Sequence, residues 1–194
     1  MLTVVAHVAV SIGAVAGCGH AEPAGPRLPA WALDPARPEK PRPRFGVRGR
    51  SESSDFVVAA LQSAGLRFGT DGTVRTLWQY LRSSHPSVEP MMARPGDVLL
   101  FRVAPVSTPD VDACEAPDGA GIVSAVDETG RIGFVEARNG RKLLSYLDPQ
   151  HPRLRRDADG QIRNSFLRTA RLTDPVEAPL LAGQMLCAVA RPSG

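Results

Sequence analysis

Cysteine and histidine are the side chains of this chain best suited to nucleophilic, acid–base or metal chemistry, and both are rare. The chain of 194 residues has three cysteines and four histidines. They are Cys18, Cys114, Cys187, His7, His20, His85 and His151. No group of them has the spacing of a zinc site, and no histidine lies near Cys114 in the sequence. We therefore expect no metal and no cofactor, and a thiol–imidazole pair would have to be assembled by the fold.

Cys18 follows an apolar, uncharged stretch, Leu2–Gly17. As a helix this stretch would reach roughly 24 Å, short of the ~30 Å hydrocarbon core of a bilayer. Val15–Cys18 resembles the lipobox of bacterial lipoprotein signal peptides. The resemblance implies cleavage before Cys18 and lipidation of its sulfur, so residues 1–18 are interpreted as the signal peptide with its lipobox. An ordinary secretory peptide, or a buried apolar arm with a free thiol, is the alternative.

The lipobox resemblance also implies a location and a partner. The chain would be secreted to the cell envelope and held at a membrane by the acylated Cys18. Gly19 replaces the aspartate that favours inner-membrane retention in such signals, so an outer membrane is expected where the cell has one. The formal net charge of +3 is too small to indicate a nucleic-acid partner.

Residues 19–50 have the composition of a tether. The segment holds seven prolines, and seven basic residues against three acidic ones. Proline at this density prevents helices and sheet ladders, so we expect an extended, partly polyproline II spacer. Its positive charge suits contacts with anionic lipid head groups or wall polymers, or the segment is simply a solvated linker.

Residues 51–194 have the pattern of a folded domain. Helical spacing of apolar residues predicts one helix that begins at Ser53 or Ser54 and ends near Gly65, and a second around Val74–Leu81, capped by Asp71 or Thr73. The predicted strands are Val98–Arg102, Gly121–Asp127, Arg131–Ala137, Lys142–Leu147 and Gln184–Ala190, with a hairpin turn at Asn139-Gly140. Helices packed on one side of an antiparallel sheet define an α+β domain.

Four segments of this domain resemble motifs of one family, in the family's order. Glu52–Val57 (ESSDFV) stands where the family has an Asp-Cys-Ser-Gly-Phe-Val type motif. Arg94–Phe101 (RPGDVLLF) matches its Pro-Gly-Asp turn and strand. Gly119–Val123 (GAGIV) and Phe134–Ala137 (FVEA) stand where it has His-Val-Gly-Ile-Val and Phe-Ile-His-Ala. The domain thus resembles the NlpC/P60 and CHAP group, which are papain-like amidohydrolases and peptidases of bacterial cell walls.

The resemblance implies a thiolate at the helix start, an imidazole on a facing strand and a polar residue that orients the imidazole. Those positions hold Ser53, Gly119 (Ala120 if the alignment shifts by one) and Glu136. A serine hydroxyl is scarcely ionised near neutral pH, and glycine offers no base. We therefore predict a degenerate papain-like domain without peptidase activity, in which Ser53 caps its helix.

The other reactive side chains leave alternatives open. His85 and His151 lie in predicted loops, and a dyad of either with Ser53 would need a loop folded over the helix start. Cys114 and Cys187 are an even pair once Cys18 is lipidated, so they form a disulfide or remain two thiols.

A further alternative concerns the segment before Gly119, where Asp110, Asp112, Glu115 and Asp118 form an acidic loop. Such a loop would suit calcium, but it lacks the pattern of an EF-hand, and a solvated loop is favoured.

The sequence therefore supports three hypotheses about function. The first is a lipid-anchored envelope protein whose groove holds a wall peptide or a protein partner without cleaving it. The second is a divergent wall hydrolase with Ser53 or Cys114 as its nucleophile. The third is a structural interaction module whose groove is filled by its own side chains.

Overall fold

The computed structural model describes residues 26–37, 52–67, 73–84, 87–104 and 114–192. Its helices are α1 (Ala30–Leu33), α2 (Glu52–Ser63), α3 (Val74–Ser84) and α4 (Ala182–Met185), with a 3₁₀ turn η1 at Pro90–Met92. Its strands are β1 (Ser87–Val88), β2 (Val98–Phe101), β3 (Gly119–Val126), β4 (Ile132–Arg138), β5 (Arg141–Leu147) and β6 (Leu186–Ala190). The predicted signal peptide with Cys18, and also His7, His20 and His85, lie outside the described residues.

The strands form one six-stranded sheet in the order β1-β6-β2-β3-β4-β5. Every neighbouring pair is antiparallel. The last strand in the sequence, β6, lies between β1 and β2, so it is an internal strand of the sheet and not an edge strand. The α+β class and the antiparallel sheet are confirmed, and the ends of the five predicted strands differ from the observed ones by at most two residues.

The turn between β4 and β5 forms at the predicted Asn139-Gly140 pair. Asn139 has a φ of 54° and Gly140 a φ of 68°. A two-residue hairpin of the I′ type needs positive φ at both central positions, which asparagine and glycine tolerate best. The turn fixes the register, with Arg138 opposite Arg141, so that Glu136 lies opposite Leu143.

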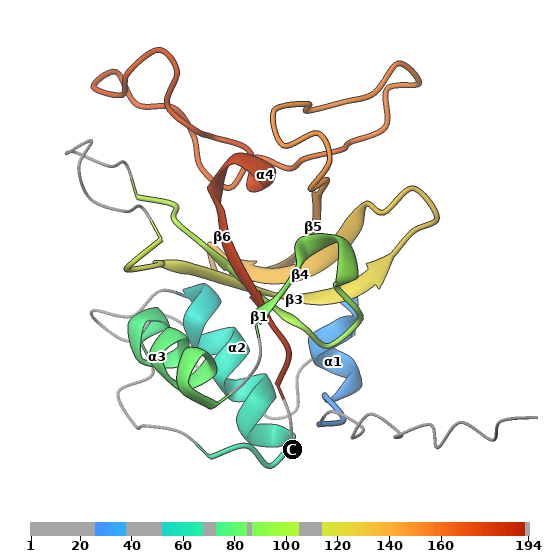
Figure 1. Ribbon diagram of the computed structural model, residues 1–194, viewed down its shortest axis with the longest axis vertical. Coiled ribbons are helices and arrows are strands. Elements are labelled where there is room, and N and C mark those ends of the chain that lie inside the picture. Colours follow the sequence, from blue (N-terminus) through green and yellow to red (C-terminus); the bar gives the residue numbers. More distant parts are fainter. Residues whose placement is uncertain (1–25, 38–51, 68–72, 85–86, 105–113, 193–194) are drawn as a thin grey trace, which may run out of the picture.

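Helices α1, α2 and α3 lie on one side of the sheet (Figure 1). Phe56 and Leu61 of α2 are fully buried in one cluster with Leu77 and Leu81 of α3 and Ile122 of β3. This recurrence of apolar residues every three or four positions is the pattern that predicted the helices. The oxygen Oγ1 of Thr73 accepts a hydrogen bond from the N–H of Thr76 at 3.1 Å, so the predicted cap of α3 is confirmed for Thr73.

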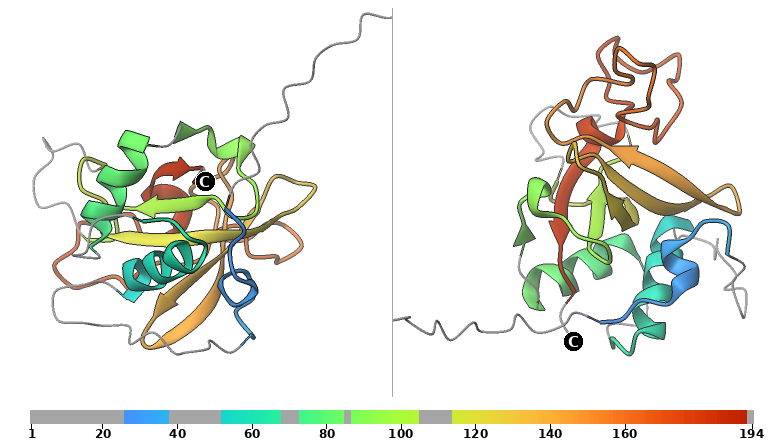
Figure 2. Two further views of the ribbon diagram at one scale, coloured as in Figure 1. Left: turned by 90° about the horizontal axis from the view of Figure 1, so that it is seen from below. Right: turned by 90° about the vertical axis from the view of Figure 1, so that its right-hand side faces the viewer.

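The opposite face of the sheet is covered by the long segment between β5 and α4, as the two views of Figure 2 also show. Phe101 and Phe134 lie 5.2 Å apart between ring centroids. They belong to a second buried cluster with Leu147, Leu167 and Met185. The sheet therefore has a core on both faces, which explains why the central strands are almost continuously apolar.

One buried amide holds the covering segment in place. Asn164 is fully buried. Its Oδ1 accepts hydrogen bonds from the N–H groups of Asp148 and Gly183, both at 3.0 Å. Its Nδ2 donates to the carbonyls of His151 at 2.9 Å and Leu154 at 2.8 Å. All four hydrogen-bonding positions of the amide are used, so a segment with little secondary structure still has a fixed path.

The beginning of the packed unit differs from the prediction. Residues 26–37 fall within the expected extended tether, yet they contain α1 and pack on the domain. Ala32 is fully buried, and the ring of Trp31 contacts that of Phe56 edge-on at 5.9 Å between centroids. The apolar residues between Pro29 and Pro35 thus form one helical turn, and this turn packs the ring of Trp31 against the domain.

Lys142 of β5 fixes α1 to the edge of the sheet. Its Nζ donates to the carbonyl of Trp31 at 2.9 Å and to that of Asp34 at 3.3 Å. It also donates to the carbonyl of Arg37. An ammonium group suits the carbonyl end of a helical turn, where the negative end of the helix dipole lies.

Candidate functional site

The three positions that carry the family resemblance line one cavity. Ser53 lies in the first turn of α2, Gly119 begins β3 and Glu136 lies on β4. The cavity has a volume of about 250 Å³, and its walls include all three residues. It forms where the start of α2 meets the end of the sheet that carries the β4–β5 turn. The fold therefore brings together residues that are far apart in the sequence.

Ser53 does not have the role expected of it. Helix α2 begins at Glu52, so both Ser53 and Ser54 lie within its first turn and neither is the cap that precedes it. The Oγ of Ser53 instead accepts a hydrogen bond from the backbone N–H of Ala120 at 3.2 Å. This contact joins the helix start to β3. Glu52 joins it to the β4–β5 turn, because its Oε2 accepts from the N–H of Gly140 at 2.8 Å.

At Gly119, where the family resemblance implies a base, the space beside the backbone is filled by the side chain of Val103. A Cβ atom added to Gly119 would lie 2.6 Å from Cγ2 of Val103, closer than such contacts can be. Val103 is held there, because its N–H donates to Oδ1 of Asp118 at 2.5 Å. A larger residue at position 119 would therefore displace Val103 before it could place a polar atom in the cavity.

Glu136 is the buried acid of the cavity. It is 7% exposed. The hydroxyl of Ser145 donates to its Oε1 at 2.6 Å, and Nη2 of Arg138 donates to the same oxygen at 3.1 Å. Among the described residues Oε2 has no hydrogen-bond partner. Burial raises the pKa of Glu136, and the contacts with Ser145 and Arg138 oppose this effect without cancelling it.

Of the two histidines considered as a base for Ser53, the structure describes only His151. His85 lies outside the described residues. His151 does not line the cavity; its Nδ1 lies 3.1 Å from Oδ2 of Asp148, and its side chain is 55% exposed. The described lining of the cavity contains no imidazole and no thiol. Its charged members are three carboxylates, from Glu52, Asp118 and Glu136, and the guanidinium of Arg138.

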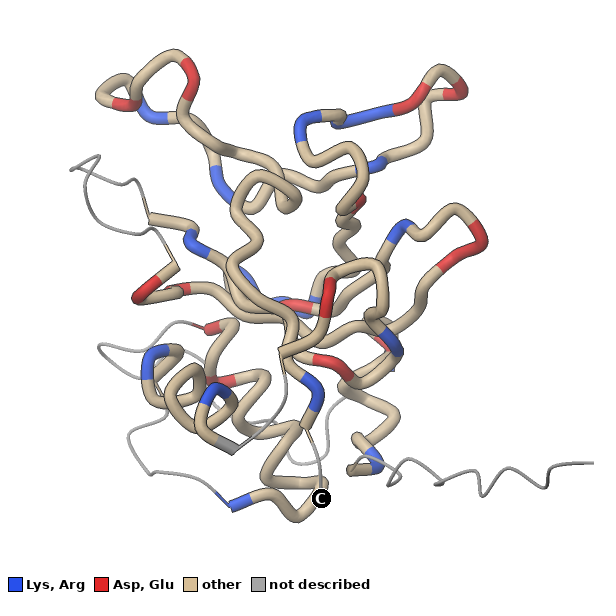
Figure 3. Tube along the Cα trace, in the orientation of Figure 1, with Lys and Arg blue, Asp and Glu red and all other residues tan. Residues whose placement is uncertain are grey.

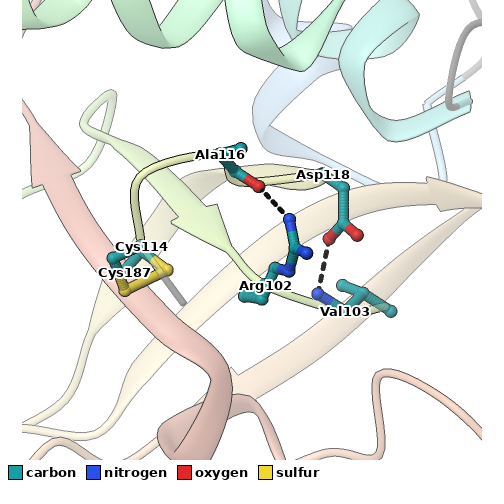
Figure 4. The surroundings of a disulfide bond; sticks show 6 residues. All are labelled: Arg102, Val103, Cys114, Ala116, Asp118 and Cys187. Carbon is teal, nitrogen blue, oxygen red and sulfur yellow. Dashed lines mark hydrogen bonds between the residues drawn. A yellow bond between two sulfur atoms is a disulfide. The ribbon is translucent and has the colours of Figure 1, made fainter. Parts of the chain in front are cut away.

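Cys114 and Cys187 form a disulfide. It connects the segment that leads into β3 with the second residue of β6, across a sequence separation of 73 residues (Figure 4). In the same segment the guanidinium of Arg102 donates to the carbonyl of Ala116. The sulfur of Cys114 is thus bonded, and as a disulfide it has no thiolate to act as a nucleophile.

The acidic loop is described only in part, because Asp110 and Asp112 lie outside the described residues. Asp118 accepts hydrogen bonds from the N–H groups of Val103 at 2.5 Å and Ala104 at 2.9 Å, one to each carboxylate oxygen. Its role here is to hold the end of β2 against the start of β3. Within the ranges that the structure describes, no group of three or more His, Cys, Asp or Glu side chains is placed to hold a metal ion.

Two residues of the site were missed by the sequence analysis, although the pattern contained a signal for both. Arg138 follows Glu136 by two residues on one strand, so their side chains share a face. Ser145 lies opposite Phe134, diagonally across from Glu136, once the Asn139-Gly140 turn sets the register. Val103 carried no such signal, because its place depends on how the chain leaves β2.

The comparisons with known proteins add no relative. No family model matches the chain, and no match is found among curated proteins or among solved structures. None of the described helices is long and apolar enough to cross a membrane. The site must therefore be interpreted from its own geometry.

Proposed function

We propose that this chain is a lipid-anchored protein of the bacterial cell envelope, and that its folded part is a degenerate papain-like domain of the NlpC/P60 or CHAP type. In this proposal the cavity at Ser53, Gly119 and Glu136 binds a cell-wall peptide or a partner protein and does not cleave it. The observation that carries the proposal is that three motif positions, distant in sequence, line the same cavity.

The chemistry of the cavity favours binding over hydrolysis. Peptide cleavage needs a nucleophile with a base beside it, and a serine hydroxyl without one is a weak nucleophile. Val103 occupies the space next to Gly119 where a base would begin. The hydrogen bonds of Glu136 are to Ser145 and Arg138 and not to Ser53, so it is not positioned to take the proton of that hydroxyl. What remains is a small cavity whose walls carry hydrogen-bond donors and acceptors beside apolar side chains.

The dimensions of the cavity suit part of a peptide. About 250 Å³ is slightly below the usual range of roughly 300–1,000 Å³ for small-molecule sites. Phe101 and Leu167 give it an apolar wall, and Glu136 and Arg138 give it charges of both signs. A wall of this mixed kind matches a peptide unit, which alternates apolar groups with amide donors and acceptors.

The envelope location rests on two features of different kinds. The apolar stretch before Cys18 resembles a lipoprotein signal. The disulfide between Cys114 and Cys187 is of the type that persists in oxidising compartments such as the periplasm or the cell surface. Both point to a protein that acts outside the cytoplasm.

The test is to incubate the purified full-length protein, in detergent, with soluble muropeptides. We expect saturable binding that shifts the backbone amide signals of Gly119 and Ala120, with no new fragments in mass spectrometry. Glu136→Gln should weaken this binding, whereas the same change at the exposed Glu128 should not. Amide cleavage that disappears in Ser53→Ala would show a hydrolase instead, and absence of binding together with absence of cleavage would contradict both functions.

A further inference from the structure

A second, larger cavity adjoins the first. It has a volume of about 460 Å³. Val103, Ala104 and Asp118 form one side of it, and the segment from Arg168 to Arg171 forms the other. Val103 and Asp118 also line the first cavity, so the two share a wall. Val103 and Asp118 therefore separate the two cavities.

Arg168 is the buried charge of this second cavity. Its side chain is 9% exposed. Its Nε donates to the carbonyl of Pro179 at 3.1 Å, and its Nη1 is paired with Oδ2 of Asp174. The third nitrogen, Nη2, is buried and has no hydrogen-bond partner among the described residues. A guanidinium N–H removed from water without an acceptor is costly, and an anionic ligand would relieve that cost.

Arg171 supplies a second guanidinium to the same cavity. Its backbone N–H donates to Oδ2 of Asp174 at 2.8 Å, which fixes the main chain of the segment. No hydrogen bond of its side chain is found among the described residues. Asp174 therefore orients both arginines: it forms an ion pair with Arg168 and is close enough to Arg171 for an electrostatic attraction. The lining of the cavity itself carries two guanidinium groups, from Arg168 and Arg171, against one carboxylate, from Asp118.

The two cavities differ in charge. The first contains Glu52 and Glu136 against Arg138, and the second contains Arg168 and Arg171, with Asp118 on the shared wall. Elsewhere along the described chain, acidic and basic residues are interspersed (Figure 3). The change of sign between adjacent cavities is therefore a local feature, and it suits a ligand that carries an anionic group at one end.

We infer that the second cavity is a carboxylate-binding subsite, in which Arg168 and Arg171 hold the free carboxylate of the peptide whose body lies in the first cavity. This inference rests on the proposed function for the identity of the ligand. Arginine is suited to the task because its planar fork of donors matches a carboxylate with two parallel hydrogen bonds. The subsite would set the direction in which a peptide binds and select peptides with an exposed acid.

The experiment uses isotope-labelled full-length protein and two short probes, N-acetyl-dialanine and its C-terminal amide. The acid should shift the backbone amide signals of Thr169, Ala170 and Arg171, and the amide should not. Arg171→Gln should weaken the acid roughly tenfold, because one charge-assisted contact is lost. The control is Arg153→Gln, which removes an exposed arginine outside both cavities.

The outcomes separate this inference from the proposed function. Equal shifts with acid and amide, or equal losses in the two arginine variants, would overturn the carboxylate subsite. If inorganic phosphate binds more tightly than N-acetyl-dialanine and displaces it, the site is one for another anion. That result would also overturn the carboxylate subsite. A muropeptide that shifts Thr169 to Arg171 but never Ala120 would leave the subsite standing and contradict binding in the first cavity.

Discussion

Two buried carboxylates of the β4–β5 hairpin region, Asp148 and Glu136, differ in how completely they are hydrogen-bonded. Asp148 follows β5 and is fully buried. Oδ2 of Asp148 accepts from Nη2 of Arg163 at 2.6 Å and from its Nε at 2.7 Å. Glu136 on β4 has contacts to one oxygen only. Burial is thus compensated by hydrogen bonds at Asp148 and only partly at Glu136.

The pKa shifts of the two groups record this difference. Burial tends to raise the pKa of Asp148, but its hydrogen bonds with Arg163, His151 and the backbone N–H groups outweigh burial and lower the pKa overall. For Glu136 burial prevails, and the pKa is raised. A carboxylate with all its partners supports the fold, whereas one left incomplete beside a cavity is available to a ligand. The comparison therefore distinguishes a structural acid, Asp148, from the acid to which we assign the proposed binding role, Glu136.

The strongest test of the comparison is Asp148→Ala. It would leave the guanidinium of Arg163 largely buried without its partner, and we expect a loss of about 3–5 kcal/mol of unfolding free energy. Asp127→Ala, which breaks an exposed pair with Arg131, should cost less than about 1 kcal/mol. Urea unfolding of both variants measures the difference, and equal losses would mean that Asp148 is not a structural support.

The same acid makes a prediction about pH. The folded-state pKa of Asp148 lies below its ordinary value of 3.8. Its stabilising contribution is therefore complete above that value and is lost as the pH falls through the folded pKa. Unfolding curves between pH 5 and pH 2 should converge for the wild type and Asp148→Ala; curves that stay parallel throughout would contradict the lowered pKa.

The next largest effect is expected from the disulfide on the cavity side. Replacing both Cys114 and Cys187 with serine should lower the unfolding free energy by about 2–4 kcal/mol. Because the bond holds the segment that leads to Gly119, amide signals of Asp118 to Ala120 should move more than those of Asn164. Changes spread evenly over both regions would show that the bond supports the whole domain and not the cavity wall in particular.

Ser53→Ala should have a smaller effect, about 1 kcal/mol, because the N–H of Ala120 loses its acceptor. The matched control is Ser83→Ala, since the hydroxyl of Ser83 donates to the carbonyl of Tyr80 in an exposed helical turn. Thermal unfolding compares the two. A stability loss no greater than that of the control would show that Ser53 does not join α2 to β3 in solution.

The smallest effect is a pH dependence at Glu136. Its folded pKa lies above its ordinary value of 4.5, so the folded protein binds this proton more tightly than the unfolded chain does. The cost of ionising it is absent below pH 4.5, grows as the pH rises toward the folded pKa and stays constant above. Glu136→Gln should therefore gain stability relative to the wild type between pH 4 and pH 7. A constant difference over that range would contradict the raised pKa.

Much of the fold could be predicted from local sequence. The positive φ values at Asn139 and Gly140, the capping oxygen of Thr73 and the apolar spacing of α2 depend on neighbouring residues only. The site was predictable as far as Ser53, Gly119 and Glu136 line one cavity. The contacts of these residues could not be predicted. A serine hydroxyl at the start of a helix can cap that helix or accept a hydrogen bond from a distant N–H, and the sequence does not distinguish the two.

The rest depends on contacts between distant segments. The segment around α1 has the composition of a linker, and it is the contacts with the ring of Phe56 and the ammonium of Lys142 that make it part of the domain. Asp148 and Arg163 looked like ordinary loop charges until the covering segment brought them together. The cavity of Arg168 and Arg171 likewise depends on where that segment lies, which no local pattern records.

The attachment of α1 has a mechanical consequence. Lys142 is on β5, an edge strand, and its ammonium group gathers three carbonyls of the N-terminal segment. If the chain is anchored through Cys18, a pull on the anchor reaches this ammonium and the Trp31 ring before it reaches α2. The load would thus be taken up first at the edge strand, where Lys142 lies opposite Ala137 of the first cavity's wall.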